Sequence, residues 1–459
     1  MSQYVDVKRR KSPRLRIISS FTPTNEMNSI RPNDITITNS SLEEITNYYD
    51  TVLNVDRTTY VSSNDEPTPM DCVKEMLDSI PNEFWQKKDL RILDPCCGNG
   101  NFGVHLYHKL SAHHSSKEIL ENILEFNDIN TQRLDNVRSI FNANKYQLQV
   151  TEHDFLKTEY EDLYDLNVAN PPYAKLLENG KRASKNHNLI KDFIQKSLQI
   201  TKPNGYLLFI TPDNWMSYAD RNELIKILTQ LQIVRLDIHT AKKYFKKIGS
   251  SFTWYLIQKR PATDNITVSG IWKKVEYTSS IPSIERKYIP LLYTNEVYNI
   301  LSKTVDAVEL EKYKVETSSD LHRYTKREII RDEEDDIYKY RLIHTAKQTC
   351  YASRPHKFQE GYKVFITTTD KYKVFVDDCG MTQSIVFIRC SGLDDANRIK
   401  MILEHPLYVF INNLCRWGNF NNIRILQSFP IPQIDSYDET TIYRHFNITD
   451  EEIKFINEH

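Results

Sequence analysis

Two spacings of apolar residues divide the chain. Between residues 90 and 260, short apolar runs alternate with stretches in which apolar residues recur every three or four positions. The short runs are typical of buried strands and the longer stretches of amphipathic helices, and their alternation favours a doubly wound parallel sheet. The predicted strands are residues 90–93, 123–126, 148–151, 166–169, 206–210, 233–237 and 252–258. The sequence therefore predicts an α/β, Rossmann-like domain with seven strands.

Helix signals fill the gaps between these runs. Residues 188–199 carry an apolar stripe at helical spacing. Upstream of the first strand, Thr68 stands where a helix N-cap is expected, and Pro69 suits the first helical position. The loop between the last two predicted strands is too short for a parallel crossover, so these two strands are expected to pair antiparallel.

The texture of the chain changes twice. Residues 1–55 are polar and lack sustained periodicity, so we expect a loosely ordered arm with one helix near 41–51. After residue 260, β-branched and aromatic runs mix with helical stretches. We therefore expect a first domain over 56–260 and a second, mixed α/β domain over 261–459, which includes a predicted helix over 394–412.

Length and composition exclude several classes of protein. The 459 residues have room for two or three domains of roughly 150 residues each. No run approaches the ~20 apolar residues of a membrane span, so we expect a cytoplasmic protein without a membrane segment. The seven cysteines show no Cys-x-x-Cys pair and no zinc spacing, which favours reduced thiols and no metal site. The net charge of −1 is uninformative; a basic tract at 8–16 and an acidic run at 332–336 are interpreted as solvated segments.

Glycine is scarce and concentrated. The chain has only eleven glycines, yet Gly98, Gly100 and Gly103 fall within six residues, directly after the first strand and Asp94. In an open parallel sheet, this turn lies at the carboxyl edge where nucleotide-like ligands bind. The Lys-Ser/Thr pair of a phosphate-binding loop is missing after the glycines. An acidic strand end with a glycine turn better suits a neutral or cationic adenosyl ligand, although an ordinary tight turn has the same pattern.

Two further carboxylates follow successive strands. Asp128 comes after the second strand, where it is placed to accept both ribose hydroxyls, and Ile129 beside it would pack against an adenine ring. Asp154 comes after the third strand, where it would accept from the adenine amino group while Phe155 packs on the ring. Surface aspartates are common at strand ends, but three in register indicate a ligand site.

The fourth strand leads into Asn170-Pro171-Pro172-Tyr173. Consecutive prolines fix the backbone and present carbonyl oxygens rigidly. The Asn170 side-chain oxygen and the Pro171 carbonyl oxygen can together accept both hydrogens of an aromatic amine, whose lone pair is otherwise delocalised into the ring. Such a grip aims the lone pair at a sulfonium methyl group for direct displacement. Tyr173 supplies a face on which a flipped base would stack.

In the order of these elements, the chain resembles the adenine-N6 DNA methyltransferases of type II restriction-modification systems. Glu66-Pro-Thr68-Pro resembles their N-terminal cofactor motif, and residues 94–103 and 170–173 resemble their glycine motif and catalytic loop. The resemblance implies a site-specific enzyme that binds S-adenosyl-L-methionine and methylates a flipped adenine. The catalytic residues it implies are Asn170, Pro171, Pro172 and Tyr173, with Phe245, or Tyr244 next to it, as a second stacking aromatic. The cofactor residues it implies are Thr68, Asp94, Pro95, Gly98, Gly100, Asp128, Ile129, Asp154 and Phe155.

The resemblance also implies partners. The second domain is similar, more loosely, to target recognition domains, so double-stranded DNA is the expected partner. The expected protein is a monomer, with a cognate restriction endonuclease acting separately. Two polar clusters in this domain are candidates for contacts with bases or phosphates, or are plain surface loops: Arg354, His356 and Lys357, and Arg416, Trp417, Asn419 and Asn421.

The sequence departs from the family in its long N-terminal arm and in Cys96 and Cys97, which stand where small residues are usual. Direct methyl transfer needs no thiol nucleophile, so both cysteines are interpreted as packing residues. Alternatives remain: the same loop serves an adenine in RNA or a glutamine in protein, and a non-catalytic binding module would keep the fold. A fused nuclease is disfavoured, because no carboxylate cluster suits metal-dependent cleavage.

Overall fold

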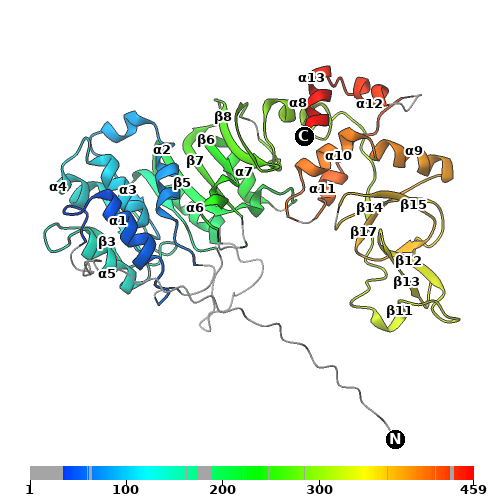
Figure 1. The fold of residues 1–459 in the computed structure, drawn as a ribbon, viewed down its shortest axis with the longest axis horizontal. Helices are drawn as coiled ribbons and strands as arrows, with labels where there is room; N and C mark the ends of the chain where they lie inside the picture. Colours follow the sequence, from blue (N-terminus) through cyan, green and yellow to red (C-terminus); the bar gives the residue numbers. More distant parts are fainter. Residues whose placement is uncertain are drawn as a thin grey trace, which may run out of the picture.

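A computed structural model describes the chain except for residues 1–34, 59, 61–64, 162, 174–188, 221, 247–248, 250, 284, 370, 419 and 435–438. The basic tract at 8–16 and Asn419 lie outside the described residues. Figure 1 shows two lobes, the first built around one large sheet and the second around two smaller sheets. No helix in the described part of the chain has the length and apolar character needed to cross a membrane.

The first lobe contains a nine-stranded sheet in the order β3-β2-β1-β4-β5-β7-β6-β8-β9. Strands β1 to β5 run parallel, and β7 lies antiparallel between β5 and β6, so the predicted antiparallel pair is confirmed. The seven predicted strands are β1 Ile92–Asp94, β2 Leu124–Asn127, β3 Gln149–Thr151, β4 Tyr164–Ala169, β5 Thr201–Pro212, β6 Leu231–Ile238 and β7 Phe252–Pro261. The α/β, Rossmann-like prediction is therefore confirmed.

The sheet continues beyond residue 260, where the sequence pattern placed the domain boundary. Strands β8 (Ile266–Trp272) and β9 (Val275–Ile281) form a hairpin, and β8 pairs parallel with β6. The texture change that suggested a boundary marks this edge hairpin, whose outer strand is largely solvent-exposed and therefore lacks the apolar run of the buried strands.

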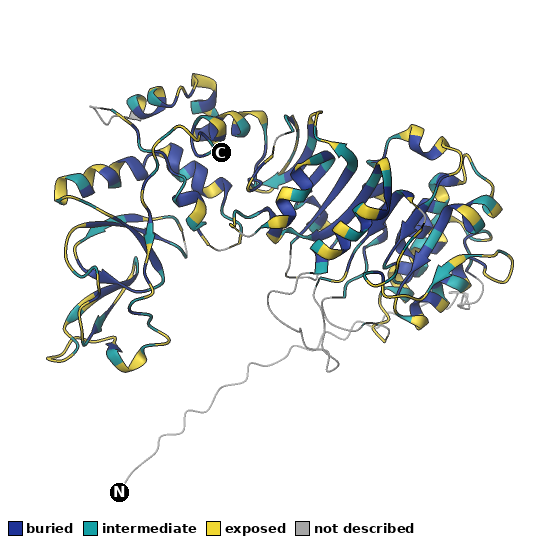
Figure 2. Cartoon of the chain, turned by 180° about the vertical axis from the view of Figure 1, so that it is seen from behind, coloured by how far each residue is buried: buried dark blue, intermediate teal, exposed yellow. Residues whose placement is uncertain are grey.

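Helices cover both faces of this sheet, as the burial colours of Figure 2 show. Neighbouring strand residues face different cores: Leu208 packs with one apolar cluster and Leu207 with the other. The first cluster includes α2 (Met70–Asp78), α3 (Asn101–Leu110) and α5 (Thr131–Ile140). The second includes α6 (Leu189–Ile200) and α7 (Glu223–Thr229).

The end of the predicted N-terminal arm belongs to the first core. The expected helix is α1 (Leu42–Tyr48), and a π-helical turn, η2 (Tyr49–Leu53), follows it. Ser41 and Glu44 form a capping box at its start. Tyr49 is fully buried, and its hydroxyl donates to the Asn99 carbonyl at 2.7 Å, inside the glycine turn. Residues 35–55 are therefore part of the folded lobe.

Over its described residues, the second lobe joins two four-stranded sheets to six α-helices. The sheets have the orders β10-β17-β14-β15 and β11-β13-β12-β16. Their strands are β10 Glu316–Thr317, β11 Ile330–Arg331, β12 Tyr340–Thr345, β13 Gln348–Ala352, β14 Lys363–Thr367, β15 Val374–Asp377, β16 Gly380–Met381 and β17 Ile385–Arg389. The helices are α8 Asn295–Lys303, α9 Leu393–Leu403, α10 Pro406–Leu414, α11 Ile423–Leu426, α12 Glu439–His445 and α13 Asp450–Glu458. The single helix predicted over 394–412 is two helices, because Pro406 starts a new one.

The Tyr49 hydrogen bond offers a test of this packing. Tyr49→Phe removes the donor from a buried carbonyl, so the free energy of unfolding should fall by about 1–3 kcal/mol. Urea denaturation measures the change. Tyr48→Phe is the matched control, because the Tyr48 hydroxyl has no hydrogen-bond partner among the described residues and is half-buried. Equal losses in both variants would contradict the assigned role of the Tyr49 hydroxyl.

Candidate functional site

The candidate site lies at the carboxyl edge of the large sheet. Strand β1 sits between β2 and β4 and runs parallel to both, so the segments after these three strands meet. The Gly98 amide donates to the Asp128 carboxylate at 2.9 Å, and the Cys96 thiol donates to the Asn170 carbonyl at 3.6 Å. The structure thus brings together the predicted glycine turn, the second carboxylate and the Asn-Pro-Pro-Tyr loop.

The glycine turn needs glycine at its first two positions. Gly98 and Gly100 have φ angles of +55° and +86°, in the left-handed region that residues with a Cβ rarely adopt. Gly103 serves a different purpose, because a Cβ there would stand 2.5 Å from the Phe126 ring. Cys97 is buried in the adjoining core, in agreement with a packing role.

Asp94 ends β1 and is buried. One of its carboxylate oxygens, Oδ1, accepts from the Cys96 amide at 3.4 Å, whereas Oδ2 has no hydrogen-bond partner among the described residues. Burial raises the pKa of Asp94 well above its usual range. A buried, unpaired carboxylate oxygen is costly unless a ligand cation or donor reaches it. The Asp94 site therefore fits the α-ammonium group of an amino-acid-like cofactor.

Asp128 is also buried, and it supports the turn. Its oxygens accept from the amides of Gly98 and Asn130, each at 2.9 Å, and burial raises its pKa. Each carboxylate oxygen has a further lone pair for a ligand hydroxyl. Ile129, beside it, is 72% exposed, an unusual position for a large aliphatic side chain. Asp128 thus offers hydrogen-bond acceptors for ribose hydroxyls, and Ile129 beside it offers an apolar surface for an adenine ring.

The third predicted pair behaves differently. Asp154 lies at the surface, where it pairs with Lys157 at 2.8 Å and accepts from the Leu156 amide. Phe155 is only 2% exposed and packs in the core against Tyr160 and Phe193. Its predicted role as a face for adenine does not fit this packing. The turn over 154–158 directs the ring into the core instead of toward the ligand edge.

Asn170 has its side-chain amide fixed from outside its own loop. Its Nδ2 donates to the Glu66 carbonyl at 2.8 Å and to the Thr68 hydroxyl at 3.1 Å. The Glu66 carbonyl can only accept, so the amide must present its NH2 group there and turn its oxygen the other way. That oxygen, Oδ1, accepts from the Tyr173 hydroxyl at 2.6 Å. Pro171 is buried and Pro172 exposed.

Thr68 was expected to cap a helix or to hold the cofactor. The structure places its buried side chain against Asn170, and Pro69 occupies the N-cap position of α2 without a side-chain cap. The Thr68 carbonyl accepts from Asn101 Nδ2 at 2.8 Å, which ties the segment to the start of α3. Pro69 has an extended ψ of 143°, so α2 starts one residue later than Thr68 capping requires.

Four charged residues and Tyr60 hold the Glu66 segment in place, and we call this group the strap. Arg57 binds the Glu66 carboxylate through two hydrogen bonds of 3.0 Å, and Arg133 pairs with Asp65 at 2.5 Å. The Tyr60 ring contacts both guanidinium groups, with centroid distances of 4.6 and 4.7 Å. The sequence did not predict this strap, because Arg133 is distant in the chain from Asp65 and the residues match no known spacing.

An aromatic row continues from the loop. The Tyr173 ring lies 6.0 Å from Phe252, and Phe252 stacks on Phe245 at 4.4 Å. Phe245 and Phe252 are equally buried, and Phe252 is the ring of the two that contacts Tyr173. Tyr244 is held by Glu75, to which its hydroxyl donates at 2.6 Å. Burial raises the pKa of Tyr173, so its hydroxyl keeps its proton and remains a donor at neutral pH.

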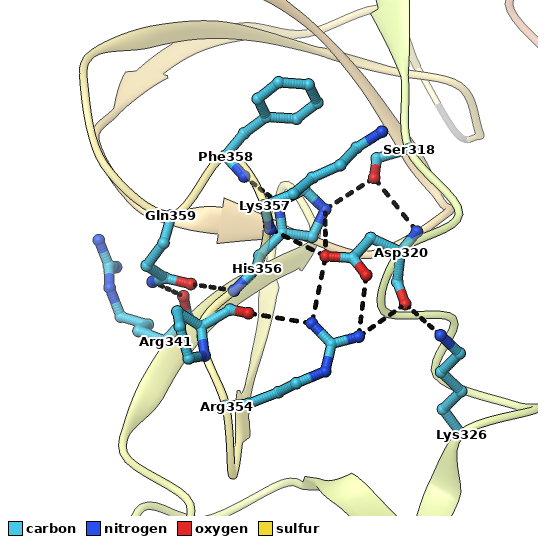
Figure 3. A network of polar contacts seen from close by, with 10 residues as sticks. Ser318, Asp320, Lys326, Arg341, Arg354, His356, Lys357, Phe358 and Gln359 are labelled. Carbon is cyan, nitrogen blue, oxygen red and sulfur yellow. Dashed lines mark hydrogen bonds and ion pairs between the residues drawn. The ribbon is translucent and has the colours of Figure 1, made fainter.

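In the second lobe, His356 belongs to a closed polar network (Figure 3). Its Nδ1 accepts from the Phe358 amide at 3.0 Å, so Nε2 carries the hydrogen and faces the Ser318 hydroxyl at 2.7 Å. A nucleophilic serine needs the reverse, an unprotonated nitrogen facing the hydroxyl. Burial lowers the pKa of His356 to about 4, so the ring is neutral.

Asp320 organises the same network. Its carboxylate accepts from the Arg354 guanidinium at 2.8 and 3.3 Å and from the Lys357 amide at 2.8 Å. Arg354 lowers the pKa of Asp320 to about 2. The cluster of Arg354, His356 and Lys357 that the sequence suggested for DNA contacts thus builds a loop, and the buried His356 is not available to read a base.

The sheet order and the carboxylates at its strand ends define the class I fold of S-adenosylmethionine-dependent methyltransferases. Residues 70–245 match one family model, described as Eco57I restriction-modification methylase. The segment contains the glycine turn, both buried carboxylates and the Asn-Pro-Pro-Tyr loop.

Named relatives agree with this assignment. The type II methyltransferase M.VspI of Vibrio sp. (strain 343) is 28% identical over 181 residues, which are 37% of this chain and 42% of the relative. The type II methyltransferase M.HincII of Haemophilus influenzae is 27% identical over 263 residues, 54% of this chain and 47% of the relative. The chain thus matches somewhat less than half of the length of these relatives.

Among solved structures, the type IIL restriction-modification enzyme MmeI in complex with DNA is similar in fold. Its TM-score is 0.50 at 10% identity, and the match covers 88% of this chain and 67% of that one. At this identity, the likeness extends to the fold of both lobes and no further.

Asp94 gives a two-sided prediction. The fold raises the pKa of Asp94, so at pH values above this folded-state pKa the ionised carboxylate lowers the free energy of unfolding. This loss of stability disappears as the pH falls from the folded-state pKa toward the unfolded-state value of about 3.9. Asp94→Asn removes the charge, so the ligand-free protein should unfold at a higher temperature at pH 8. The Kd for S-adenosylmethionine should rise by roughly 30-fold or more, because its ammonium group loses a buried carboxylate partner.

Differential scanning calorimetry and isothermal titration calorimetry measure the two effects. Asp135→Asn is the control, since Asp135 is an exposed carboxylate of the same lobe that pairs with Arg138 at the surface. An Asp94→Asn variant that binds the cofactor normally would remove Asp94 from the site.

Proposed function

We propose that this protein transfers the methyl group of S-adenosylmethionine to the exocyclic amino group of adenine in double-stranded DNA. The observation that carries the proposal is the fixed Asn170 amide, whose oxygen is turned away from the Glu66 segment and, among the described residues, accepts from a tyrosine hydroxyl alone. A side chain oriented in this way is ready to accept from an incoming NH2 group.

The chemistry requires positioning more than acid or base groups. Asn170 Oδ1 and the Pro171 carbonyl would accept the two hydrogens of the adenine NH2, which pulls its nitrogen toward tetrahedral geometry. Asp94, Asp128 and Ile129 would hold S-adenosylmethionine, which supplies the methyl group when bound. Asp94 would bind its ammonium group and Asp128 its ribose, and neither exchanges a proton with the substrate.

Tyr173 is proposed to change partners during the reaction. Its hydroxyl now occupies the acceptor that the substrate amine needs. An entering base would displace this hydroxyl from Asn170 and stack on the ring, so one hydrogen bond replaces another at Oδ1. Phe252, whose ring lies 6.0 Å from the Tyr173 ring, would support Tyr173 in its stacked position.

Duplex DNA is the proposed substrate because the relatives are type II methyltransferases and MmeI was solved with DNA. The second lobe, with two sheets and six helices, gives the surface that such recognition requires. We further propose that the protein acts as a monomer and is the modification partner of a separate restriction endonuclease.

Asn170→Ala tests the proposal directly. We expect methyl transfer to duplex DNA to fall by roughly 10²–10³-fold, as when one preorganised hydrogen-bond group is removed elsewhere. Transfer of tritiated methyl groups to duplex DNA, ribosomal RNA and total protein, run in parallel, measures both the loss and the substrate class. Predominant labelling of RNA or protein by the unsubstituted enzyme would contradict the proposed substrate.

Thr68→Val tests how Asn170 is oriented. The valine keeps the shape but removes the hydroxyl that accepts from Asn170, so kcat should fall by roughly 5- to 30-fold, equivalent to about 1–2 kcal/mol. The Kd for S-adenosylmethionine should stay unchanged. Thr68→Ser restores the acceptor and should restore kcat. If Thr68→Val instead weakens cofactor binding at unchanged kcat, Thr68 belongs to the cofactor site.

A further inference from the structure

A loop of the second lobe is anchored on the carboxyl edge of the large sheet. The Trp417 ring packs edge-on against His239 at 5.1 Å, and its Nε1 donates to the Ile289 carbonyl at 2.8 Å. His239 follows β6 and is itself bonded to Asp213 at 2.5 Å, directly after β5. Trp417 therefore ties this loop to the ends of two strands of the first lobe.

The other end of the loop is held as firmly. Asn422 Nδ2 donates to the Ser217 hydroxyl and to the Tyr218 carbonyl, each at 3.0 Å. Asn421 is buried and bonded to Asn412 and to the Thr367 carbonyl. Arg424 forms an ion pair with Asp220 of the first lobe.

Phe420 lies between these anchors and is 62% exposed. Its backbone bridges to Thr369, and its side chain lines a hollow of about 480 Å³ between the lobes. The hollow is otherwise lined by residues 218–220 of the first lobe and by Thr368 and residues 421–424 of the second. Because contacts hold the loop at both ends, the large apolar ring of Phe420 is preorganised in its exposed position.

A chain of contacts links this loop to the candidate site. Tyr173 contacts Phe252, and Phe252 pairs across the sheet with Pro212. Asp213 comes next in sequence, bonds to His239 and thereby reaches Trp417. Phe420 thus stands on a loop that touches the same edge of the sheet as the Asn-Pro-Pro-Tyr loop.

We propose that Phe420 inserts into the DNA duplex beside the target adenine and fills the space that the flipped base leaves. This inference rests on the proposed function and names the residue that would open the duplex. A base can reach Asn170 only outside the helix, and extruding it costs a few kcal/mol of stacking and pairing. An apolar wedge offsets part of that cost, because it restores a stacked surface inside the duplex. The Arg424 side chain is 44% exposed and is suited to the neighbouring sugar-phosphate backbone.

The test compares two substrates that differ in the cost of flipping. Both carry the site found by mapping methylated adenines in DNA from cells that express the protein. In one duplex the target adenine is paired with thymine; in the other it faces an abasic position. The protein is full-length, and the readout is kcat/KM for methylation.

Phe420→Ala should lower kcat/KM on the paired duplex by roughly 30-fold, a loss in the range set by the cost of unstacking one base step. On the duplex with the abasic position, where the base leaves the stack readily, the same variant should approach the unsubstituted enzyme. Phe420→Leu should keep most of the activity on both substrates. Ile337→Ala is the control for loss of an exposed apolar side chain on the same lobe, since Ile337 is 65% exposed and lies outside the hollow.

Three results would overturn the inference. Equal losses on both duplexes would show that Phe420 supports the fold or binding in general. If Phe420→Ala loses no activity on either duplex, Phe420 has no role in flipping the base. Absence of methylation by the unsubstituted enzyme on both duplexes would instead refute the proposed function, and the inference would fall with it.

Discussion

The structure depends on the direction of one side-chain amide. Asn170 directly follows β4, an interior strand of the large sheet, and its NH2 group is bound by two acceptors from a segment about a hundred residues earlier in the chain. An unconstrained asparagine presents oxygen or nitrogen with little preference, and only the oxygen can accept from a substrate amine. The Glu66 carbonyl resolves this choice, because a backbone carbonyl never donates.

Much of the first lobe serves to hold that acceptor in place. Arg57 and Arg133 bind the two acidic residues next to the Glu66 carbonyl, and Tyr60 lies against both guanidinium groups. The same segment continues through Thr68 to Asn101, at the start of the helix that follows the glycine turn. Hydrogen bonds therefore connect the glycine turn, where the cofactor is proposed to bind, with the Asn170 acceptor. We expect that fixing the position of one also fixes the position of the other.

Residues that act through local geometry were predictable from the sequence, and those that act through distant contacts were not. The three glycines of the turn, Asp94 and Asp128 lie at or just after the ends of strands. The apolar pattern of the sequence already predicts where those strands end. Thr68 was placed near the site, but its partner was not, since a hydroxyl's direction depends on tertiary packing. The spacing of Phe155 predicts a ligand contact, and the sequence did not predict that its ring packs in the core, because that packing depends on Tyr160 and Phe193. The edge hairpin after residue 260 was missed because its exposed strand lacks an apolar run.

A crystal structure of the protein with sinefungin and a duplex containing its methylation site would test the account most directly. We expect the target adenine outside the helix, with its N6 within about 3 Å of both Asn170 Oδ1 and the Pro171 carbonyl oxygen, and Asn170 Nδ2 still bonded to Glu66 and Thr68. Tyr173 should have left Oδ1. An adenine amine bound elsewhere, or an Asn170 amide released from the Glu66 segment, would contradict the central claim.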